Sequence, residues 1–328
     1  MKKSSLMFST ILIISTMVTL SSNNWISMWM GLELNMMSFI PLILNKINKS
    51  SSEAAMIYFL IQSMSSMMML MMVLINMYNY VLSMNMINSI INISLLIKLG
   101  AAPFHMWMPE ILSKMEWMKC SILMTWQKIA PLMMINNMNN SGLIIYMSII
   151  WSVSIGSLGG INQTSLRKMM GYSSISHLGW MLAINKAMNL WIIYLIIYSV
   201  MIVLMCWLFL DYKMYFINQV SMMNMNNTEK ISLFTMMLSM GGLPPFIGFL
   251  PKWITIQSMI NEKEFLCIFI MIMFSLIILM YYLRVMTNMY MSFNSSVKWI
   301  TFHKNKTLTL TIFLINMSLP LIMIVDIM

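Results

Sequence analysis

The chain has 328 residues, of which 60% are hydrophobic and 9% are charged, with a mean hydropathy of +0.80 and a net charge of +10. A soluble domain carries about 25% charged residues, so this chain cannot cover a water-facing surface of its own. The composition excludes a soluble globular enzyme, a coiled coil and a disordered chain. It indicates an all-α polytopic membrane protein.

Apolar windows of about 20 residues predict eleven transmembrane helices. They form a single transmembrane domain over residues 1–328, with connections too short for a separate soluble domain. The predicted spans are 4–22, 25–45, 53–77, 84–109, 120–136, 142–160, 168–185, 189–210, 231–258, 264–285 and 307–326.

The basic residues gather on one face of this predicted topology. Fourteen lie on the face of the amino terminus, and only Lys186 and Lys263 lie on the other. The positive-inside rule then places the amino terminus on the side from which the chain is inserted and the carboxyl terminus on the opposite side. Basic loops that face anionic lipid explain the net charge without a nucleic-acid partner. The fourteen are Lys2, Lys3, Lys46, Lys49, Lys114, Lys119, Arg167, Lys168, Lys213, Lys230, Arg284, Lys298, Lys304 and Lys306.

Methionine provides 49 of the 328 residues. This abundance suggests a genetic code that reads an isoleucine codon as methionine, as animal mitochondria do. Methionine that merely fills apolar volume is the alternative explanation. No Arg-rich transit peptide precedes the first apolar run, as expected of a chain inserted where it is made. We therefore expect a multi-pass protein of the mitochondrial inner membrane, with its amino terminus in the matrix and its carboxyl terminus in the intermembrane space.

Cysteine and histidine give no sign of a redox centre. The cysteines lie far apart without a C-x-x-C pair, which argues against a disulfide framework or an iron–sulfur motif. The histidines lack the paired spacing of multihaem membrane proteins. We expect no cofactor and no metal in this chain. The residues concerned are Cys120, Cys206, Cys267, His105, His177 and His303.

Four ionisable residues lie well inside apolar spans: Glu33, Lys98, Lys128 and Lys252. Each central charge costs roughly 2.5–3.5 kcal/mol on insertion scales, so a functional role is expected. A structural ion pair, or a lysine that extends to the interface, is the alternative for each.

Helix-breaking residues lie beside two of these lysines. Lys98 is followed by Gly100 and Pro103, while Lys252 follows a Gly-Gly-Leu-Pro-Pro run at 241–245. Proline opens the helical hydrogen-bond ladder, and freed backbone groups persist in a membrane only against protein or water. Two discontinuous helices next to hydrated cavities are therefore predicted, with simple kinks as the alternative.

These charges are suited to proton transfer. The proton affinity of Lys98 depends on whether the Glu33 carboxylate is near, so this pair can act as a switch. Lys128, His177 and Lys252 are then successive proton holders. His177 is the least distinctive of them, because a hydrogen-bonded packing histidine fits the sequence nearly as well.

Four segments carry a family resemblance: 28–35 (MWMGLELN), 96–110 (LIKLGAAPFHMWMPE), 125–131 (TWQKIAP) and 241–253 (GGLPPFIGFLPKW). In order along nearly the whole chain, they resemble the subunit 2 family of mitochondrial NADH:ubiquinone oxidoreductase, respiratory complex I, in its short animal form. The composition is insect-like.

The resemblance implies an antiporter-like proton-pumping subunit with inverted repeats. It implies that Glu33 and Lys98 form the switch pair, that Lys128 is the central relay and that Lys252 is the terminal residue, with His177 on the same axis. NADH, FMN, iron–sulfur clusters and ubiquinone would be bound by other subunits. The implied partners are neighbouring antiporter-like subunits and lipids.

Two other functions stay open at this stage. A stand-alone cation/proton antiporter would use the same charges and broken helices, although buried lysines repel a metal cation. A structural scaffold would use the charges only to hold neighbouring helices together.

Overall fold

The structure, a computed structural model of the whole chain, describes residues 3–44, 48–78, 83–138, 142–186, 190–222, 225–291 and 306–320. These residues are mainly helical, and their only bridge of the β type joins Ser165 to Phe216. The helices are α1 (Lys3–Ser21), α2 (Trp25–Ile43), α3 (Lys49–Met77), α4 (Met84–Leu99), α5 (Trp107–Lys114), α6 (Trp117–Met124), α7 (Ile129–Asn137), α8 (Leu143–Ile161), α9 (Leu166–Ala183), α10 (Leu190–Asp211), α11 (Ile217–Met222), α12 (Asn227–Gly241), α13 (Phe249–Asn261), α14 (Phe265–Met291) and α15 (Lys306–Asn316), with 3-10 turns η1 (Trp126–Lys128) and η2 (Ile184–Lys186).

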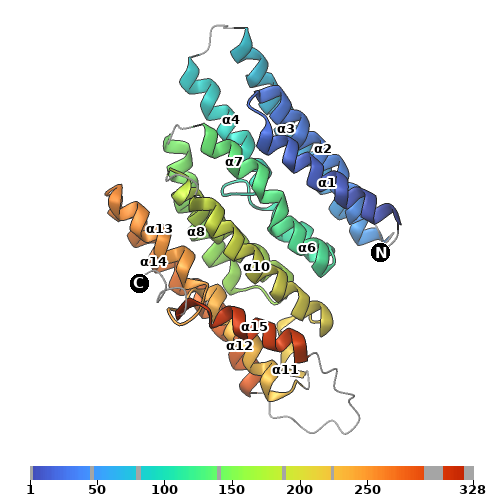
Figure 1. Cartoon of the computed structure of the whole chain (residues 1–328), viewed down its shortest axis with the longest axis vertical. Coiled ribbons are helices and arrows are strands. Elements are labelled where there is room, and N and C mark those ends of the chain that lie inside the picture. The colour runs from blue at the N-terminus through green and yellow to red at the C-terminus, as the bar shows by residue number, and fades with distance from the viewer. Residues whose placement is uncertain are drawn as a thin grey trace.

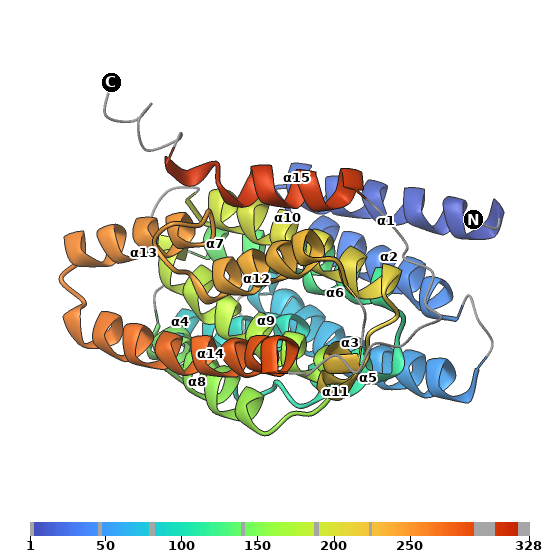
Figure 2. The same cartoon turned by 90° about the horizontal axis from the view of Figure 1, so that it is seen from below.

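The long helices lie side by side with their axes in one common direction (Figures 1 and 2). Helices α1 to α4 form one edge of the bundle, α6 to α10 form its middle, and α12 to α15 form the other edge (Figure 1). Close packing joins α1 to α2, α3 to α4, α8 to α9 and α8 to α14. The buried core therefore runs through the whole bundle between layers of helices.

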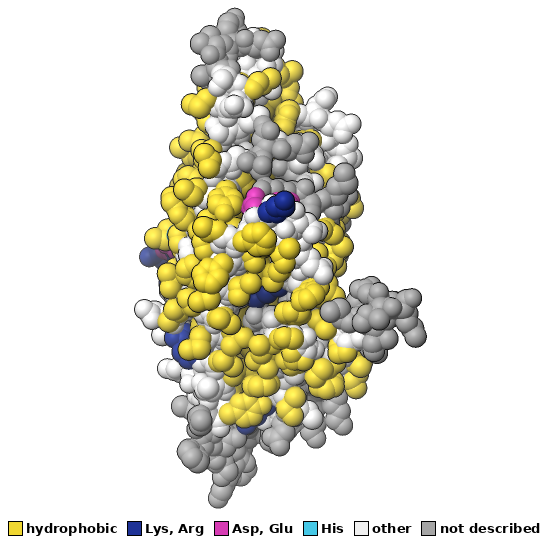
Figure 3. Space-filling model, turned by 90° about the vertical axis from the view of Figure 1, so that its left-hand side faces the viewer, with side chains coloured by type: hydrophobic (Ala, Val, Ile, Leu, Met, Phe, Trp, Pro, Cys, Tyr) yellow, Lys and Arg dark blue, Asp and Glu magenta, His cyan; other side chains and the backbone are white. Residues whose placement is uncertain are grey.

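Five helices are long and apolar enough to cross a membrane: α2, α3, α8, α10 and most of α14. Shorter apolar helices occupy Ser5–Ser21 and Met84–Leu99. Large apolar side chains such as Leu143, Met56 and Leu266 are exposed on these helices, and hydrophobic atoms dominate the face shown in Figure 3. A soluble monomer rarely exposes so much continuous apolar surface, so lipid is the natural environment of this face.

Most helix boundaries lie within a few residues of the predicted spans. The span predicted at 142–160 is α8, and the one at 168–185 corresponds to α9. Three features differ: α14 continues to Met291 rather than 285, α15 ends at Asn316 rather than 326, and the connection predicted at 211–230 contains the short helix α11. Residues 321–326 of the last predicted span lie outside the described part of the chain. A total of eleven membrane crossings stays a prediction.

The two expected helix breaks are present, and a glycine ends the helix at each. Gly100 has φ +69° after α4, and Gly242 has φ +79° after α12. Only glycine adopts this left-handed conformation without strain, so both helices stop there. The chain resumes as a helix at Trp107 in the first case and at Phe249 in the second.

A third interruption was not predicted. The span predicted as a continuous helix at 120–136 is α6, then a turn of 3-10 helix that contains Lys128, then α7. Pro131 lies in the first turn of α7, where its missing N–H cannot bond to the preceding turn. The hydroxyl of Thr125 also bonds back to the Ser121 carbonyl at 2.7 Å, a contact that tends to bend helices.

Helix ends and connections at one end of the bundle carry most of the described basic side chains of the amino-terminal face, and Arg284 reaches this end from within α14. Contacts across this end tie the loops together, including Lys114 to Glu53 and Arg284 to the Gln163 carbonyl. The residues there are Lys49, Lys114, Lys119, Arg167, Lys168, Lys213, Lys230 and Arg284. Lys2, Lys46, Lys298, Lys304 and His303 lie outside the described residues.

Candidate functional site

The three lysines predicted from the apolar spans are all removed from the protein surface. Lys98, Lys128 and Lys252 are 8%, 2% and 5% exposed. Burial of a charged ammonium without compensation is costly, so the contacts of each lysine indicate how the fold tolerates it.

Lys98 lies in the last turn of α4, just before the break at Gly100. The negative end of the helix dipole favours a cation at this position. The Gln62 side chain of α3 donates from Nε2 to the Lys98 carbonyl at 3.3 Å. The broken helix is therefore held against α3 by a bond to a backbone group at its free end.

A small polar cavity connects Lys98 to Lys128. Its volume is about 20 Å³, and both lysines line it together with Asn35, Gln62 and Gln127. A polar cavity of roughly 10–15 Å³ or more can hold one water molecule. The cavity is thus large enough for one water to join the two lysines.

Side-chain hydrogen bonds fix the wall of this cavity. Tyr58 donates from its hydroxyl to Gln127 Oε1 at 3.2 Å, and Gln127 donates from Nε2 to Asn35 Oδ1 at 3.0 Å. The chain of bonds connects α3, the turn η1 and α2. Both polar atoms of the Gln127 amide are therefore held by hydrogen bonds. Gln127 directly precedes Lys128 in the sequence.

Glu33 lies on α2, two residues before Asn35, and its side chain is half-buried. Its carboxylate interacts electrostatically with Lys98. Within the described residues, Glu33 forms no ion pair with Lys98 or with any other basic side chain. The two residues of the predicted switch pair therefore interact at a distance in this conformation, without direct contact.

Lys128 ends the 3-10 turn η1 and extends toward α9 and α10. Its ammonium donates to the Ser174 carbonyl at 3.0 Å and to the Tyr198 hydroxyl at 3.4 Å. It also lies 4.9 Å from the centre of the Tyr198 ring, within the range of a cation–π interaction. Three favourable contacts compensate for the burial of this charge.

His177 on α9 is packed between two tyrosines of α10. Its Nδ1 shares a hydrogen bond of 2.7 Å with the Tyr194 hydroxyl, and its ring lies 4.9 Å from that of Tyr198. The Met240 carbonyl lies near the ring, but Nε2 forms no hydrogen bond among the described residues. The charges of Lys128 and Lys252 both act on this imidazole. His177 therefore lies electrostatically between the two lysines.

Lys252 lies in the first turn of α13 and points back at the end of α12. Its ammonium donates to the Gly241 carbonyl at 2.7 Å and lies 5.7 Å from the centre of the Trp180 ring. The free carbonyls at the end of α12 stabilise a cation. The break at Gly242 thus creates the acceptor that Lys252 uses.

The structure brings Lys98, Lys128 and His177 together through the shared cavity and Tyr198. Glu33 and Lys252 interact with this group only electrostatically, Glu33 with Lys98 and Lys252 with His177. Sequence reasoning missed the tyrosines Tyr194 and Tyr198, which lie four residues apart on one face of α10. It also missed the amides Asn35, Gln62 and Gln127. A position close to a buried charge in the sequence was the available signal for Gln127 and Asn35, whereas Gln62 and the two tyrosines lie on helices without such a charge.

The other described histidine, His105, and the three cysteines are all buried. His105 is buried in the break after α4, where Nδ1 lies 3.2 Å from the Pro103 carbonyl. None of the three cysteines forms a disulfide. Among the described residues, no group of three or more His, Cys, Asp or Glu side chains is arranged to hold a metal ion.

Comparison with known proteins assigns the family. The family model described as "NADH:quinone oxidoreductase/Mrp antiporter, TM" matches residues 22–278. The relative named NADH-ubiquinone oxidoreductase chain 2 from Locusta migratoria is 39% identical over 95% of this chain and 93% of its own length. The relatives of the same name from Anopheles gambiae and Aedes aegypti are 44% and 42% identical, over 89% and 94% of this chain and 87% and 94% of their own lengths.

Solved structures show the same fold at low identity. A chain of respiratory complex I from Thermus thermophilus superposes with a TM-score of 0.79 at 17% identity, over 94% of this chain and 75% of that one. A chain of the Mrp complex from Dietzia sp. superposes with a TM-score of 0.77 at 14% identity, over 86% of this chain and 60% of that one. Because the family model and the insect relatives both match most of its length, the chain belongs to the NADH-ubiquinone oxidoreductase chain 2 family of antiporter-type membrane proteins.

Proposed function

We propose that this chain is a core membrane subunit of NADH:ubiquinone oxidoreductase and carries protons across the mitochondrial inner membrane. The route is the series Glu33, Lys98, Lys128, His177 and Lys252. The observation that carries the proposal is the uninterrupted set of contacts from the cavity at Lys98 to the imidazole of His177.

Each link in this series is suited to passing a proton. An ammonium at Lys98 can give a proton to a water in the shared cavity, and that water can give one to a neutral Lys128. The Tyr198 hydroxyl both accepts and donates, so it can relay a proton beyond Lys128. The His177 imidazole can exchange a proton at either ring nitrogen, and its Nε2, which has no hydrogen-bond partner among the described residues, can complete the relay toward Lys252.

Repulsion between like charges couples the protonation of neighbouring residues in the series. Cations packed into a low-dielectric interior repel each other strongly, so the proton occupancy of one site changes that of its neighbours. Approach of the Glu33 carboxylate would hold a proton on Lys98, and its withdrawal would release that proton. In this structure Glu33 forms no ion pair with Lys98 but still acts on it electrostatically, so the structure lies between these two conditions.

The distribution of basic residues supports one orientation of the chain in the membrane. We propose eleven crossings with the amino terminus in the matrix and the carboxyl terminus in the intermembrane space. The basic side chains gathered at one end of the bundle support this orientation, since the matrix side is expected to carry the lysines and arginines.

The driving reaction belongs to other subunits in this proposal. NADH, FMN, iron–sulfur clusters and ubiquinone would be bound by other chains, and neighbouring antiporter-like subunits would be the direct partners. Electron transfer there would move Glu33 relative to Lys98 and so set the proton affinity of the series.

Substitution of Lys128 tests the proposal. In proteoliposomes that contain the purified complex, Lys128→Met should lower proton uptake per NADH oxidised, because the relay loses its central site. Lys230→Gln, which removes a lysine at the start of α12, is the control and should pump normally. Loss of assembly in parallel with pumping would instead indicate a scaffold.

Native electrophoresis tests the assignment to the complex itself. The band that contains this chain should oxidise NADH and hold flavin and iron–sulfur partners. A small band without NADH activity, under conditions that keep other respiratory complexes intact, would contradict the proposal and indicate a stand-alone antiporter.

A further inference from the structure

A second polar cavity lies at the basic end of the bundle, away from the lysine series. Its volume is about 360 Å³, and it opens between the end of α2, the start of α3, the junction of α5 with α6 and the start of α9. Three cations line it, namely Lys114, Lys119 and Arg167, against one carboxylate, Glu116. The lining therefore carries an excess of positive charge.

The cations differ in how far carboxylates compensate them. Lys114 pairs with Glu53 at 3.1 Å and Glu110 at 3.5 Å. Lys119 pairs with Glu116 at 3.6 Å and donates to the Ile43 carbonyl at 3.1 Å. Lys114 and Lys119 are thus already paired with carboxylates of the protein.

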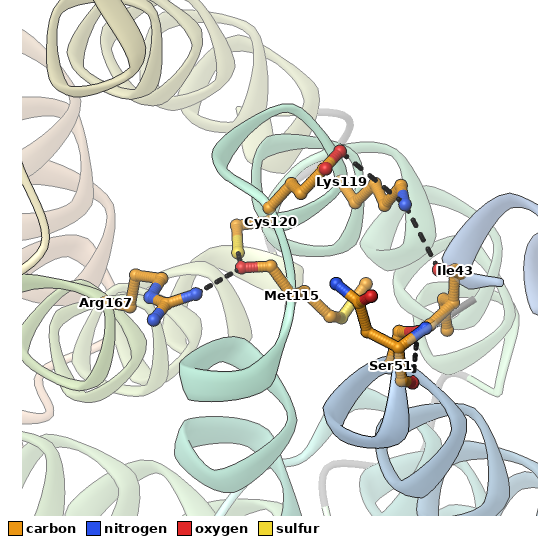
Figure 4. Close-up of polar contacts among 8 residues, drawn as sticks. Ile43, Ser51, Met115, Lys119, Cys120 and Arg167 are labelled. Carbon is orange, nitrogen blue, oxygen red and sulfur yellow. Dashed lines mark hydrogen bonds and ion pairs between the residues drawn. The ribbon is translucent and has the colours of Figure 1, made fainter. Parts of the chain in front are cut away.

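Arg167 is the uncompensated cation of this cavity. It donates from Nη1 to the Met115 carbonyl at 2.6 Å, and its guanidinium lies 4.8 Å from the centre of the Tyr215 ring. Among the described residues it pairs with no carboxylate, and its buried Nε has no hydrogen-bond partner. Figure 4 shows Arg167 and Lys119 reaching the Met115 and Ile43 carbonyls from different sides.

Two helix starts add to the positive potential. Helix α3 begins after Asn48 and helix α9 begins after Ser165, and each presents its positive dipole end near the cavity. The start of α3 is already capped by Asn48 and Ser51. This helix end therefore contributes positive electrostatic potential rather than unpaired N–H donors. The free donors come from the guanidinium of Arg167.

We propose that this cavity binds the phosphate of an anionic phospholipid, with Arg167 as the anchor. A guanidinium matches phosphate oxygens with several N–H donors in a fixed plane, and the excess charge favours a net anionic head group. The cavity lies where helices end, which is the level of the lipid head groups. Exposed apolar side chains on the next turns of α3, Met56, Phe59 and Leu60, provide surface for the acyl chains. The assignment does not depend on proton transfer.

Photolabelling of the purified complex tests this site. The probe is a phosphatidylglycerol with a diazirine near its head group, with the matching phosphatidylcholine as the zwitterionic comparison. Phosphatidylglycerol should label peptides that contain residues 48–56 and 115–119 more strongly than phosphatidylcholine does. Arg167→Gln should lower that labelling about tenfold, as expected from loss of charge-assisted hydrogen bonds.

The control is Lys168→Gln, which removes the adjacent positive charge on α9 without altering the cavity lining. Its labelling should equal that of the unaltered complex. If Arg167→Gln does not assemble, Arg167→Lys keeps the charge but loses the planar fork, and should give an intermediate loss of labelling. Equal labelling by the two lipids, or no change in either Arg167 variant, would overturn the proposal. Displacement of the lipid label by excess inorganic phosphate would overturn the lipid as the source and assign a free phosphate.

Discussion

The Lys128 ammonium contacts Tyr198 in two ways, through a hydrogen bond of 3.4 Å to the hydroxyl and at 4.9 Å from the ring centre. The ring contact stabilises the charged lysine, whereas the hydroxyl offers a path along which its proton can leave. Because the same ring lies 4.9 Å from that of His177, one residue of α10 joins the two predicted proton holders.

Removal of the Tyr198 hydroxyl separates these two roles. Tyr198→Phe keeps the aromatic ring and should allow assembly, but it should lower the rate of proton transfer beyond Lys128 by about tenfold or more. Proton uptake per NADH oxidised in proteoliposomes measures the effect. NADH oxidation with a water-soluble electron acceptor should not change. Tyr290→Phe removes an exposed hydroxyl on α14 and is the control. Equal pumping by the two variants would exclude the hydroxyl from the route.

Gln127 offers a test of the water-sized cavity. Gln127→Met leaves the Tyr58 hydroxyl and the Asn35 amide oxygen without their partners. Each unpaired buried group costs about 1–3 kcal/mol, so the midpoint of thermal unfolding should fall. Pumping should fall as well, because the wall that orients water between Lys98 and Lys128 is lost.

The control for Gln127 is Gln257→Met, which alters an exposed glutamine on α13. This variant should keep both stability and pumping. A Gln127→Met complex that is less stable yet pumps normally would show that the network is purely structural.

The fold was largely predictable because the apolar spans are long and the charges between them are few. The boundaries of α8 and α10 follow directly from the ends of apolar runs. The breaks after Lys98 and before Lys252 were also predictable, since glycine and proline lie beside each charge. The interruption that contains Lys128 was not predictable, because it contains no glycine and the nearest proline, Pro131, lies three residues after Lys128.

The charged residues of the site were predictable for a different reason. A lysine inside an apolar span is expensive, so each one stands out in the sequence. Tyr194 and Tyr198 do not, because tyrosine is common in apolar helices and its role depends on which helix packs against it. The packing of α10 against α9 is a tertiary contact, and no local sequence pattern predicts it.

The conformation of Gly242 provides a test of how Lys252 is held. A Cβ at this position would lie 2.7 Å from the Lys252 ammonium, and φ +79° disfavours any other residue. Gly242→Ala should therefore cost roughly 1–2 kcal/mol in backbone strain and displace Lys252 from the Gly241 carbonyl. Thermal unfolding should occur at a lower temperature, and pumping should fall.

Gly142 gives the matched control for this change. It precedes α8 with φ −70°, and a Cβ there would meet no atom within 4 Å. Gly142→Ala should therefore leave stability and pumping unchanged. Normal pumping by Gly242→Ala would mean that the contact of Lys252 with α12 is not needed for the relay.

The ion pair between Lys114 and Glu53 predicts a stability effect at alkaline pH. Its hydrogen bond to Glu53 raises the pKa of Lys114 above the ordinary value of 10.5, against partial desolvation. A raised pKa in the folded state stabilises the protein below pH 10.5, and this contribution is lost as the pH rises through the folded pKa. Both side chains are partly exposed, so the contribution is small, about 0.2–1 kcal/mol, and salt should weaken it.

Comparison of the unaltered complex with Glu53→Gln measures this contribution. At neutral pH and low salt the variant should unfold at a slightly lower temperature, and the difference should shrink as the pH rises above 10.5. Glu110→Gln removes the longer contact at 3.5 Å and should show a smaller difference. A difference that persists at high pH would show that Glu53 stabilises this end of α3 by something other than the charge of Lys114.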